Sequence, residues 1–249
     1  MAAIRTRQRK AAVATALLGA TLGLALLVTS RGSADEAEKS RAMQLGSTAH
    51  TPRPNCPTPP ASENPPADKA CQAMARVTGF QTEADGRHNP FKVRKPGFIV
   101  GWGISLSKPS KSEQHFFESE ISKSGRPSAR ISIIKPKSDG RYKLIRQSPI
   151  VRLKSELGSK PIFTLTDPLK VKKGMFVALT TTTWVSNLAD AGASGSDSWR
   201  ASREDGQCLN AEDLLKRSRP QQKVGGIRTY ACDYDGARIL YWAYLAPRR

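Results

Sequence analysis

The sequence is poor in the side chains that build metal sites. Its 249 residues include four cysteines and three histidines, and no two cysteines form a CxxC pair. His50, His88 and His115 are far from one another along the chain. Structural zinc sites normally use closely spaced ligand pairs. We therefore predict no metal site, and no motif in the sequence calls for a cofactor.

The motifs of nucleophilic catalysis are also missing. No Gly-x-Ser-x-Gly sequence occurs. Ser105 and Lys108 have the spacing of a serine–lysine nucleophile pair, but that chemistry places both residues at the start of a helix. Here they end a predicted strand, and no Lys-Thr-Gly sequence follows. We attribute the spacing to chance and predict no catalytic residue.

Paired carboxylates, which glycoside hydrolases require, lack a supporting pattern. Glu118 and Glu120 would share a strand face if that segment were extended, and Asp233 and Asp235 have the same spacing. Neither pair lies in an apolar pattern that would hold it in a cleft, so we interpret both as solvated or turn residues. The second pair also resembles the start of a calcium loop, but no acid follows at the far end. A hydrolase assembled from residues distant in sequence stays open as the alternative function.

Acidic residues are few compared with basic ones. The chain has 40 lysines and arginines against 21 acids, a net charge of +19. Residues 1–34 contain five basic residues and no acid, so the remainder keeps 35 basic against 21 acidic residues, or +14. Such a chain is attracted to polyanions by a field that salt screens. Charge alone does not choose between nucleic acid, anionic lipid and an acidic wall polymer.

The N-terminal segment predicts export. Four positive residues within positions 1–10 precede twenty uncharged residues at 11–30. A helix of that length rises about 30 Å, the thickness of a bilayer core. The small residues 32–34 would also suit a signal peptidase. Residues 1–34 are thus a signal anchor or a cleaved signal peptide. We favour single-pass anchoring with the N-terminus inside over secretion; in both cases the remainder is extracytoplasmic and nucleic acid is not an expected partner.

An even number of cysteines in an exported chain predicts two disulfides. We favour Cys56–Cys71 with Cys208–Cys232, because short loops close at less entropic cost. The other pairings would staple the N-terminal segment to the C-terminal strand, and they stay open. Residues 35–69 form a charged and proline-rich spacer, with seven prolines between positions 47 and 69. Such a spacer is semi-rigid and would hold the domain of residues 70–249 away from the membrane.

Apolar residues that alternate with a period of two predict strands through this domain. In residues 98–106 we expect Phe98, Val100, Trp102, Ile104 and Leu106 on one face. Ile99, Gly101, Gly103 and Ser105 would lie on the other, and this nearly bare face suggests a bulge or a close approach. Other strands are predicted over residues 129–134, 142–147, 150–154, 169–172, 175–185 and 238–245. Asp-Gly pairs at 85–86, 139–140, 205–206 and 235–236 mark tight turns. This pattern predicts an all-β fold, a single β-sandwich of jelly-roll type.

Few segments have the pattern of a helix. After the leader, residues 210–220 have the one convincing helical pattern, capped by Asn210 and ended by Pro220. Residues 35–45 could also form a short helix, and residues 67–77 one or two helical turns. Residues 108–127 and 186–207 are predicted to be long irregular segments, which in compact domains are often functional or disordered.

Four stretches carry a resemblance to a known group. They are residues 148–153, 169–184, 199–203 and 230–242. Through them the chain resembles exported proteins of unknown function from high-G+C soil bacteria. The resemblance would cover the chain from about Cys71 to its end. It implies an exported, jelly-roll-like domain and no activity.

The residues with the chemistry of a ligand site are Trp199, Arg200 and Arg203. Sugar-binding sandwiches place aromatic rings where the apolar faces of sugars can stack, with polar neighbours that bind hydroxyls. A tryptophan packed over the core edge would give the same sequence pattern, because large aromatic residues are mostly buried. Our first hypothesis is a non-catalytic, surface-displayed β-sandwich that binds a glycan or an anionic partner, such as a wall polymer or lipid headgroups.

Overall fold

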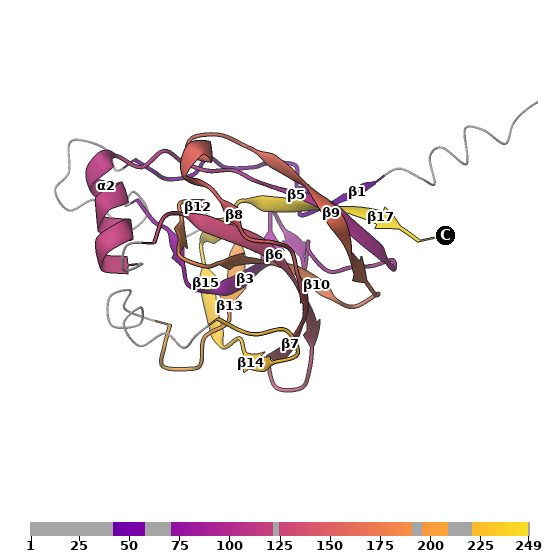
Figure 1. The fold of residues 1–249 in the computed structure, drawn as a ribbon. Helices are drawn as coiled ribbons and strands as arrows, with labels where there is room; N and C mark the ends of the chain where they lie inside the picture. The colour runs from indigo at the N-terminus through magenta and orange to yellow at the C-terminus, as the bar shows by residue number, and fades with distance from the viewer. Residues whose placement is uncertain (1–41, 58–70, 122–124, 191–195, 209–220, 249) are drawn as a thin grey trace, which may run out of the picture. The chain divides into compact units, whose positions relative to one another are not determined.

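The computed structural model describes residues 42–57, 71–121, 125–190, 196–208 and 221–248 (Figure 1). The predicted leader, much of the predicted spacer and the predicted helix over residues 210–220 lie outside these ranges. Among the described residues, no helix has the length and apolar character needed to cross a membrane. All of them belong to one unit that begins at Ser40.

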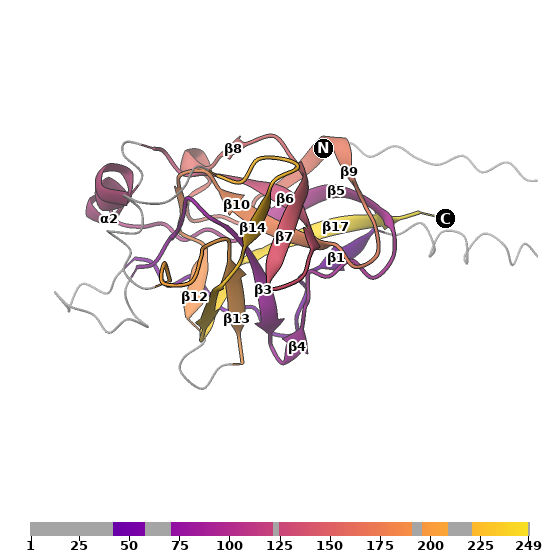
Figure 2. The same ribbon diagram turned by 90° about the horizontal axis from the view of Figure 1, so that it is seen from below.

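Antiparallel strands dominate the structure, which confirms the predicted all-β class. The smaller sheet has four strands, in the order β1 (Met43–Leu45), β17 (Tyr241–Pro247), β5 (Gly97–Ile104) and β9 (Ile162–Val171). The first and last of the described strands are therefore neighbours, with Met43 opposite Leu245. Figure 2 shows β1, β17 and β5 side by side.

The larger sheet has seven strands along its main path. Their order is β14 (Ile227–Thr229), β7 (Arg141–Gln147), β6 (Ser128–Pro136), β10 (Phe176–Thr181), β3 (Thr78–Ala84), β13 (Ser198–Ala201) and β15 (Cys232–Asp235). Two short strands extend it, β4 (Arg87–His88) on β3 and β8 (Val151–Arg152) on β6. Separate two-stranded pairs join β11 (Trp184–Val185) to β2 (Met74–Ala75), and β12 (Leu188–Asp190) to β16 (Ala237–Ile239).

The two sheets share one hydrophobic core. Ile99, Trp102 and Ala243 of the smaller sheet lie in the same buried cluster as Ile131 and Val177 of the larger sheet. These five residues expose no surface. Burying such side chains stabilises a fold by about 1.5–3 kcal/mol each. The sheets thus form two layers over a common interior.

The chain alternates between the layers. We consider eight strands, β1, β3, β5, β6, β7, β9, β10 and β17, and leave aside β13, β14 and β15 at the two ends of the larger sheet. Numbered one to eight along the chain, they run one, eight, three, six in the smaller sheet and five, four, seven, two in the larger. Among these eight, successive strands lie in the same sheet only at β6 and β7, which the predicted Asp139-Gly140 turn connects.

The predicted face of β5 is wrong at its start. Ile99 is fully buried, whereas Phe98 is 36% exposed and Val100 is partly exposed. The register against β9 shifts between Ile99 and Gly101, which is a β-bulge. One extra residue on the bulged strand reverses the alternation, so that Ile99 and Trp102 face the same core. On the side of β5 that carries small residues, the Trp242 ring of β17 closely approaches the backbone. A Cβ atom on Gly103 would lie 2.2 Å from that ring.

One segment that we expected to be irregular contains a helix. Residues Lys111–Phe116 form α2, which continues as a π-helix, η1 (Phe117–Ile121). The Ser110 hydroxyl accepts a hydrogen bond from the Glu113 N–H, and the Glu113 side chain accepts one from the Ser110 N–H. This capping box stabilises the start of a short helix. A second short helix, the 3-10 turn η2 (Lys154–Glu156), follows β8.

The predicted Asp-Gly turns agree with the backbone. Gly86, Gly140, Gly206 and Gly236 all have positive φ, with values between 64° and 76°. In two of the pairs the aspartate also has positive φ, 52° at Asp85 and 59° at Asp139. Two consecutive residues of this kind match the right-handed twist of the strands that they connect.

Both disulfides have the short-loop pairing expected from the sequence. Cys56 bonds to Cys71, with Cα atoms 4.5 Å apart. Cys208 bonds to Cys232, with Cα atoms 5.2 Å apart. No cysteine is left free.

Removal of either disulfide should lower the free energy of unfolding by about 3 kcal/mol, because each bond restricts the unfolded chain by closing a loop. The sequence separations of 15 and 24 residues keep the effect from being larger. The double variants Cys56→Ser/Cys71→Ser and Cys208→Ser/Cys232→Ser test the two separately, by urea unfolding followed by tryptophan fluorescence. Wild-type protein under reducing conditions should be less stable than either variant. A double variant with the wild-type unfolding midpoint would contradict the assigned pair.

Candidate functional site

A pocket of about 630 Å³ opens beside α2 and η1. That volume lies in the range typical of small-molecule sites. Phe116, Phe117 and Ile121 line the helical side, while Met74 and Trp199 are among the residues on the sheet side. Cys71 and Cys208 also line it, so each disulfide contributes one cysteine. We call this the disulfide-rimmed pocket.

Trp199 lies on β13 and not in the irregular segment that we expected. Its ring stacks on Tyr234, with centroids 4.3 Å apart and planes 17° apart. A Cβ atom on Gly79 would lie 2.9 Å from the same ring, which explains the glycine at that position. Trp199 is 6% exposed, and its Nε1 has no hydrogen-bond partner among the described residues. One face of the Trp199 ring contacts Tyr234 and one edge contacts β3. We therefore interpret Trp199 as a packing residue and not as a platform on which a sugar stacks.

The structure separates the three predicted ligand residues. Trp199 and Arg203 line the pocket, but Arg200 points to the other face of the sheet, as strand alternation requires. The Arg200 Nε and Nη2 atoms donate to the two carboxylate oxygens of Asp233, at 2.7 and 2.6 Å. These hydrogen bonds raise the pKa of Arg200. Arg200 therefore belongs to a cross-strand ion pair, while the Arg203 Nη2 reaches the Ala75 carbonyl at 3.4 Å.

The weaker catalytic candidates do not meet in one place. Ser105 is buried and Lys108 is exposed. Glu118 and Glu120 lie on the π-helix η1 and not on a strand. The Glu118 carboxylate accepts a hydrogen bond from the Lys154 Nζ at 2.8 Å. No group of three histidine, cysteine or acidic side chains in the described part of the chain is placed to hold a metal ion.

Two of the three histidines, His50 and His88, stand next to single carboxylates. His50 Nδ1 is 3.5 Å from Asp85, and His88 Nδ1 is 3.3 Å from Glu83. His115 lies on α2, where its carbonyl accepts a hydrogen bond from the Ser119 hydroxyl. Among the described residues we find no serine hydroxyl bonded to a histidine ring.

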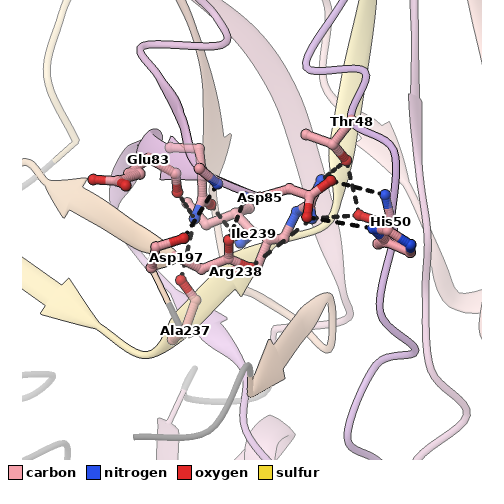
Figure 3. Close-up of polar contacts among 11 residues, drawn as sticks. Thr48, His50, Glu83, Asp85, Asp197, Ala237, Arg238 and Ile239 are labelled. Atoms are coloured by element: carbon pink, nitrogen blue, oxygen red, sulfur yellow. Dashed lines mark hydrogen bonds and ion pairs between the residues drawn. The ribbon is translucent and has the colours of Figure 1, made fainter. Parts of the chain in front are cut away.

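A buried arginine, Arg238, joins three segments of the fold (Figure 3). Its Nη1 donates to the His50 carbonyl at 2.7 Å and its Nη2 donates to the Thr48 hydroxyl. Asp197 lies 3.9 Å from the same Nη1 and accepts a hydrogen bond from the Asp85 N–H at 2.7 Å. These donors and acceptors satisfy one another, so we interpret the cluster as a clamp that holds residues 48–50 on β16.

The clamp shifts the ionisation of its members. Burial lowers the pKa of Arg238, although the nearby Asp197 and Asp85 oppose that shift. The hydrogen bond from the His50 N–H lowers the pKa of Asp85. Asp85 is therefore a carboxylate at neutral pH. Its contribution to the stability of the folded state is lost only as the pH falls through its lowered pKa.

The outer face of the larger sheet carries a different constellation. On β6, Ala129 and Ile131 face the core, so Ser128 and Arg130 alternate to the outside. Arg152 on β8 lies opposite Ser128 across the strand pair. A shallow hollow of about 640 Å³ lies here, lined by Arg126, Ser128, Ile150, Arg152 and Thr182. Arg130 is not among these lining residues but projects from the same face of β6, so we call Arg126, Ser128, Arg130, Arg152 and Thr182 the arginine face.

Its arginines have no acidic partner in the part of the chain that the structure describes. The ion pairs of the described residues involve other basic side chains, and none includes Arg126, Arg130 or Arg152. Arg126 and Arg152 are exposed, but Arg130 is partly buried. The Nε of Arg130 has no hydrogen-bond partner among the described residues, and burial lowers the pKa of this arginine. We did not predict this group from the sequence, because its members are brought together by the register of β6 with β8, which the sequence pattern does not specify.

Comparisons with known proteins returned no matching family model, no similar curated protein and no similar solved structure. The geometry of the two sites is therefore the basis for any functional conclusion.

Arg238→Met should lower the free energy of unfolding by about 3 kcal/mol, because it removes one side of a buried polar cluster. The matched control is Arg141→Met, which removes an exposed ion pair with Asp139 and should cost less than about 1 kcal/mol. Urea unfolding measures both. Equal effects of the two substitutions would contradict the clamp.

Trp199→Ala should destabilise the domain by about 3–5 kcal/mol, as expected for a buried aromatic residue. Phe116→Ala provides the control in the same pocket, because Phe116 is 42% exposed and should cost little when truncated. Thermal unfolding compares the two variants. Wild-type stability in Trp199→Ala would mean that this residue is not part of the packing.

Proposed function

We propose that this chain is an exported, non-catalytic β-sandwich protein that binds an anionic component of the cell envelope through the arginine face. The observation that carries the proposal is that Arg126 and Arg152 line one hollow, with Arg130 on the same face of β6, and that none of the three has an acidic partner among the described residues. Arginine is weakly hydrated and offers several donors to one anion, so it suits such contacts better than lysine. The net charge of +14 outside residues 1–34 would attract a polyanion from a distance.

Export rests on two independent features. The predicted leader carries the chain across a membrane, and the two disulfides fit an oxidising compartment. Anchoring through residues 11–30, in preference to secretion, would hold the arginine face close to envelope polymers and lipid headgroups. The domain would then act where anionic surfaces are abundant.

We further assign the domain to the jelly-roll architecture. The strand order one, eight, three, six in one sheet and five, four, seven, two in the other supports this assignment. A jelly roll consists of eight strands in two sheets, wound as two Greek keys. The assignment is consistent with a place among the exported proteins of unknown function that the sequence resembles. It supplies architecture and no activity, since one fold carries many functions.

The alternative of an extracellular hydrolase has less support. Asp233 and Asp235 are both among the residues that border the disulfide-rimmed pocket, but Asp233 lies opposite Arg200 and its carboxylate shares the face of that arginine. However, both carboxylate oxygens of Asp233 accept hydrogen bonds from Arg200, so this residue is not free to act as an acid or a base. A glycan site on Trp199 is disfavoured for the reason given above, because its ring packs against Tyr234.

The test is retention of the full chain, purified in a nonionic detergent, on isolated cell-wall material at rising salt concentration. Retention should fall steeply with salt, because screening weakens attraction between exposed charges. The triple variant Arg126→Ser/Arg130→Ser/Arg152→Ser should be retained at least about tenfold less. The control Lys135→Ser/Lys137→Ser/Arg141→Ser removes the same charge from the β6–β7 hairpin. Retention that is independent of salt, or equal loss in both triple variants, would refute the proposal.

A further inference from the structure

We infer that the outer face of the smaller sheet binds an uncharged polysaccharide, by stacking the Trp242 ring against the apolar face of a pyranose. This face belongs to the layer of β1, β17, β5 and β9, whereas the arginine face lies on the larger sheet (Figure 1). The inference is independent of the proposed function. It rests on an aromatic ring that lies flat on the sheet and on a row of uncharged polar side chains beside that ring.

Strand alternation places two aromatic residues of β17, Trp242 and Tyr244, on this outer face. The residues that alternate with them are buried in the core, namely Tyr241, Ala243 and Leu245. Trp242 and Tyr244 are both partly exposed. On the neighbouring strand, Gly103 lies opposite Trp242 and Gly101 lies opposite Tyr244. The two aromatic side chains therefore stand beside a lane of β5 that has no side chains of its own.

The Trp242 ring lies over this lane. A Cβ atom on Gly103 would lie 2.2 Å from two carbon atoms of the ring, so one ring face is closed by the backbone of β5. The exposed part of Trp242 is then its outer face and rim. The Nε1 of Trp242 donates to the Tyr244 hydroxyl at 3.0 Å, which fixes the ring within the plane of the sheet. A platform that is held before binding loses little conformational entropy when a ligand binds.

A row of uncharged polar side chains runs across the sheet beside the ring. Gln44 of β1 lies opposite Tyr244, and Thr164 of β9 lies opposite Gly101 on the other side of β5. Gln44 and Thr164 are exposed. The Tyr244 hydroxyl accepts its hydrogen bond from Trp242, so its own proton is left to donate to another acceptor. The row thus offers an amide and two hydroxyls, which can both donate and accept hydrogen bonds.

A pyranose has the chemistry that this surface fits. The faces of the sugar ring carry C–H groups, which stack on a flat aromatic ring, and its rim carries hydroxyls, which pair with groups that both donate and accept. Ile162, opposite Gly103 on β9 and 56% exposed, extends the apolar area beside the Trp242 ring. A lipid surface selects apolar side chains that project into the acyl layer, together with basic residues. Trp242 lies flat instead, and its polar neighbours Gln44, Thr164 and Tyr244 are uncharged.

The experiment is calorimetric titration of the full chain with cellohexaose and with chitohexaose, in a polyoxyethylene detergent that carries no sugar. At least one of the two should bind, equally at low and high salt, because neither is charged. Trp242→Leu keeps an apolar side chain over Gly103 but removes the ring, so it should weaken binding at least about tenfold. Thr164→Val removes one exposed hydroxyl at constant shape and should weaken binding about threefold. Phe116→Leu, which removes an exposed aromatic ring elsewhere, is the control and should bind like the wild type.

Several results would overturn the inference and leave the anionic function standing. They are absence of binding to both oligosaccharides, full affinity in Trp242→Leu, and equal loss in Phe116→Leu. Thermal unfolding shows whether Trp242→Leu keeps the fold; if it does not, Thr164→Val, at an exposed position, decides alone, and its full affinity would be the contrary result. Cross-linked dimers that Trp242→Leu abolishes, without sugar binding by the wild type, would mean that a second copy of the chain covers this face.

Discussion

The final strand, β17, is the element on which both layers depend. It pairs with β1 on one side and with β5 on the other, so that the smaller sheet has no continuous form without it. The Tyr241 hydroxyl donates to the Val177 carbonyl of the larger sheet at 2.9 Å, and the Tyr241 ring stacks on Phe91 at 4.0 Å. Arg238, three residues earlier, fixes the segment that follows β1. One C-terminal stretch thus closes the smaller sheet, connects the layers and holds the N-terminal segment.

The same alternation that builds the core also builds the arginine face. Along β6, one set of side chains enters the interior and the other set stands on the outside, two residues apart. The interior set is aliphatic and the outer set carries Ser128 and Arg130. A strand that is central in its sheet therefore performs both tasks, and the rigid pairing on either side of it fixes the positions of the polar set. Sites built on strands are more precise than sites built on loops.

Sequence patterns were informative where local periodicity decides the structure. The strands over 129–134 and 142–147, the four Asp-Gly turns and the pairing of the cysteines all follow from short-range rules. The orientation of Phe98 did not follow, because the bulge at Val100 depends on how β5 meets its neighbours. The helix α2 was missed although its capping box, Ser110 with Glu113, was visible in the sequence. Its few apolar residues gave too weak a helical period to outweigh the polar composition.

The candidate sites were less accessible to sequence reasoning. Trp199 and Arg200 are adjacent in the chain, yet a strand of four residues sends them to opposite faces. Arg126, Arg130 and Arg152 come together only through the register of β6 with β8. Neither the strand at 198–201, whose sequence has little β pattern, nor that register can be read from composition.

The position of β1 has a mechanical consequence. It is a three-residue edge strand that pairs with β17 alone among the described strands, and it leads directly into the segment that Arg238 clamps. A pull applied on the N-terminal side of Met43 would peel β1 away first and then release the Thr48 and His50 contacts. The Cys56–Cys71 bond would then carry the pull directly to Cys71, so that the chain between the two cysteines would bear no load. Tension on the domain would therefore extend the short segment from β1 to Cys56. The arginine face, which lies on the other sheet, would keep its structure.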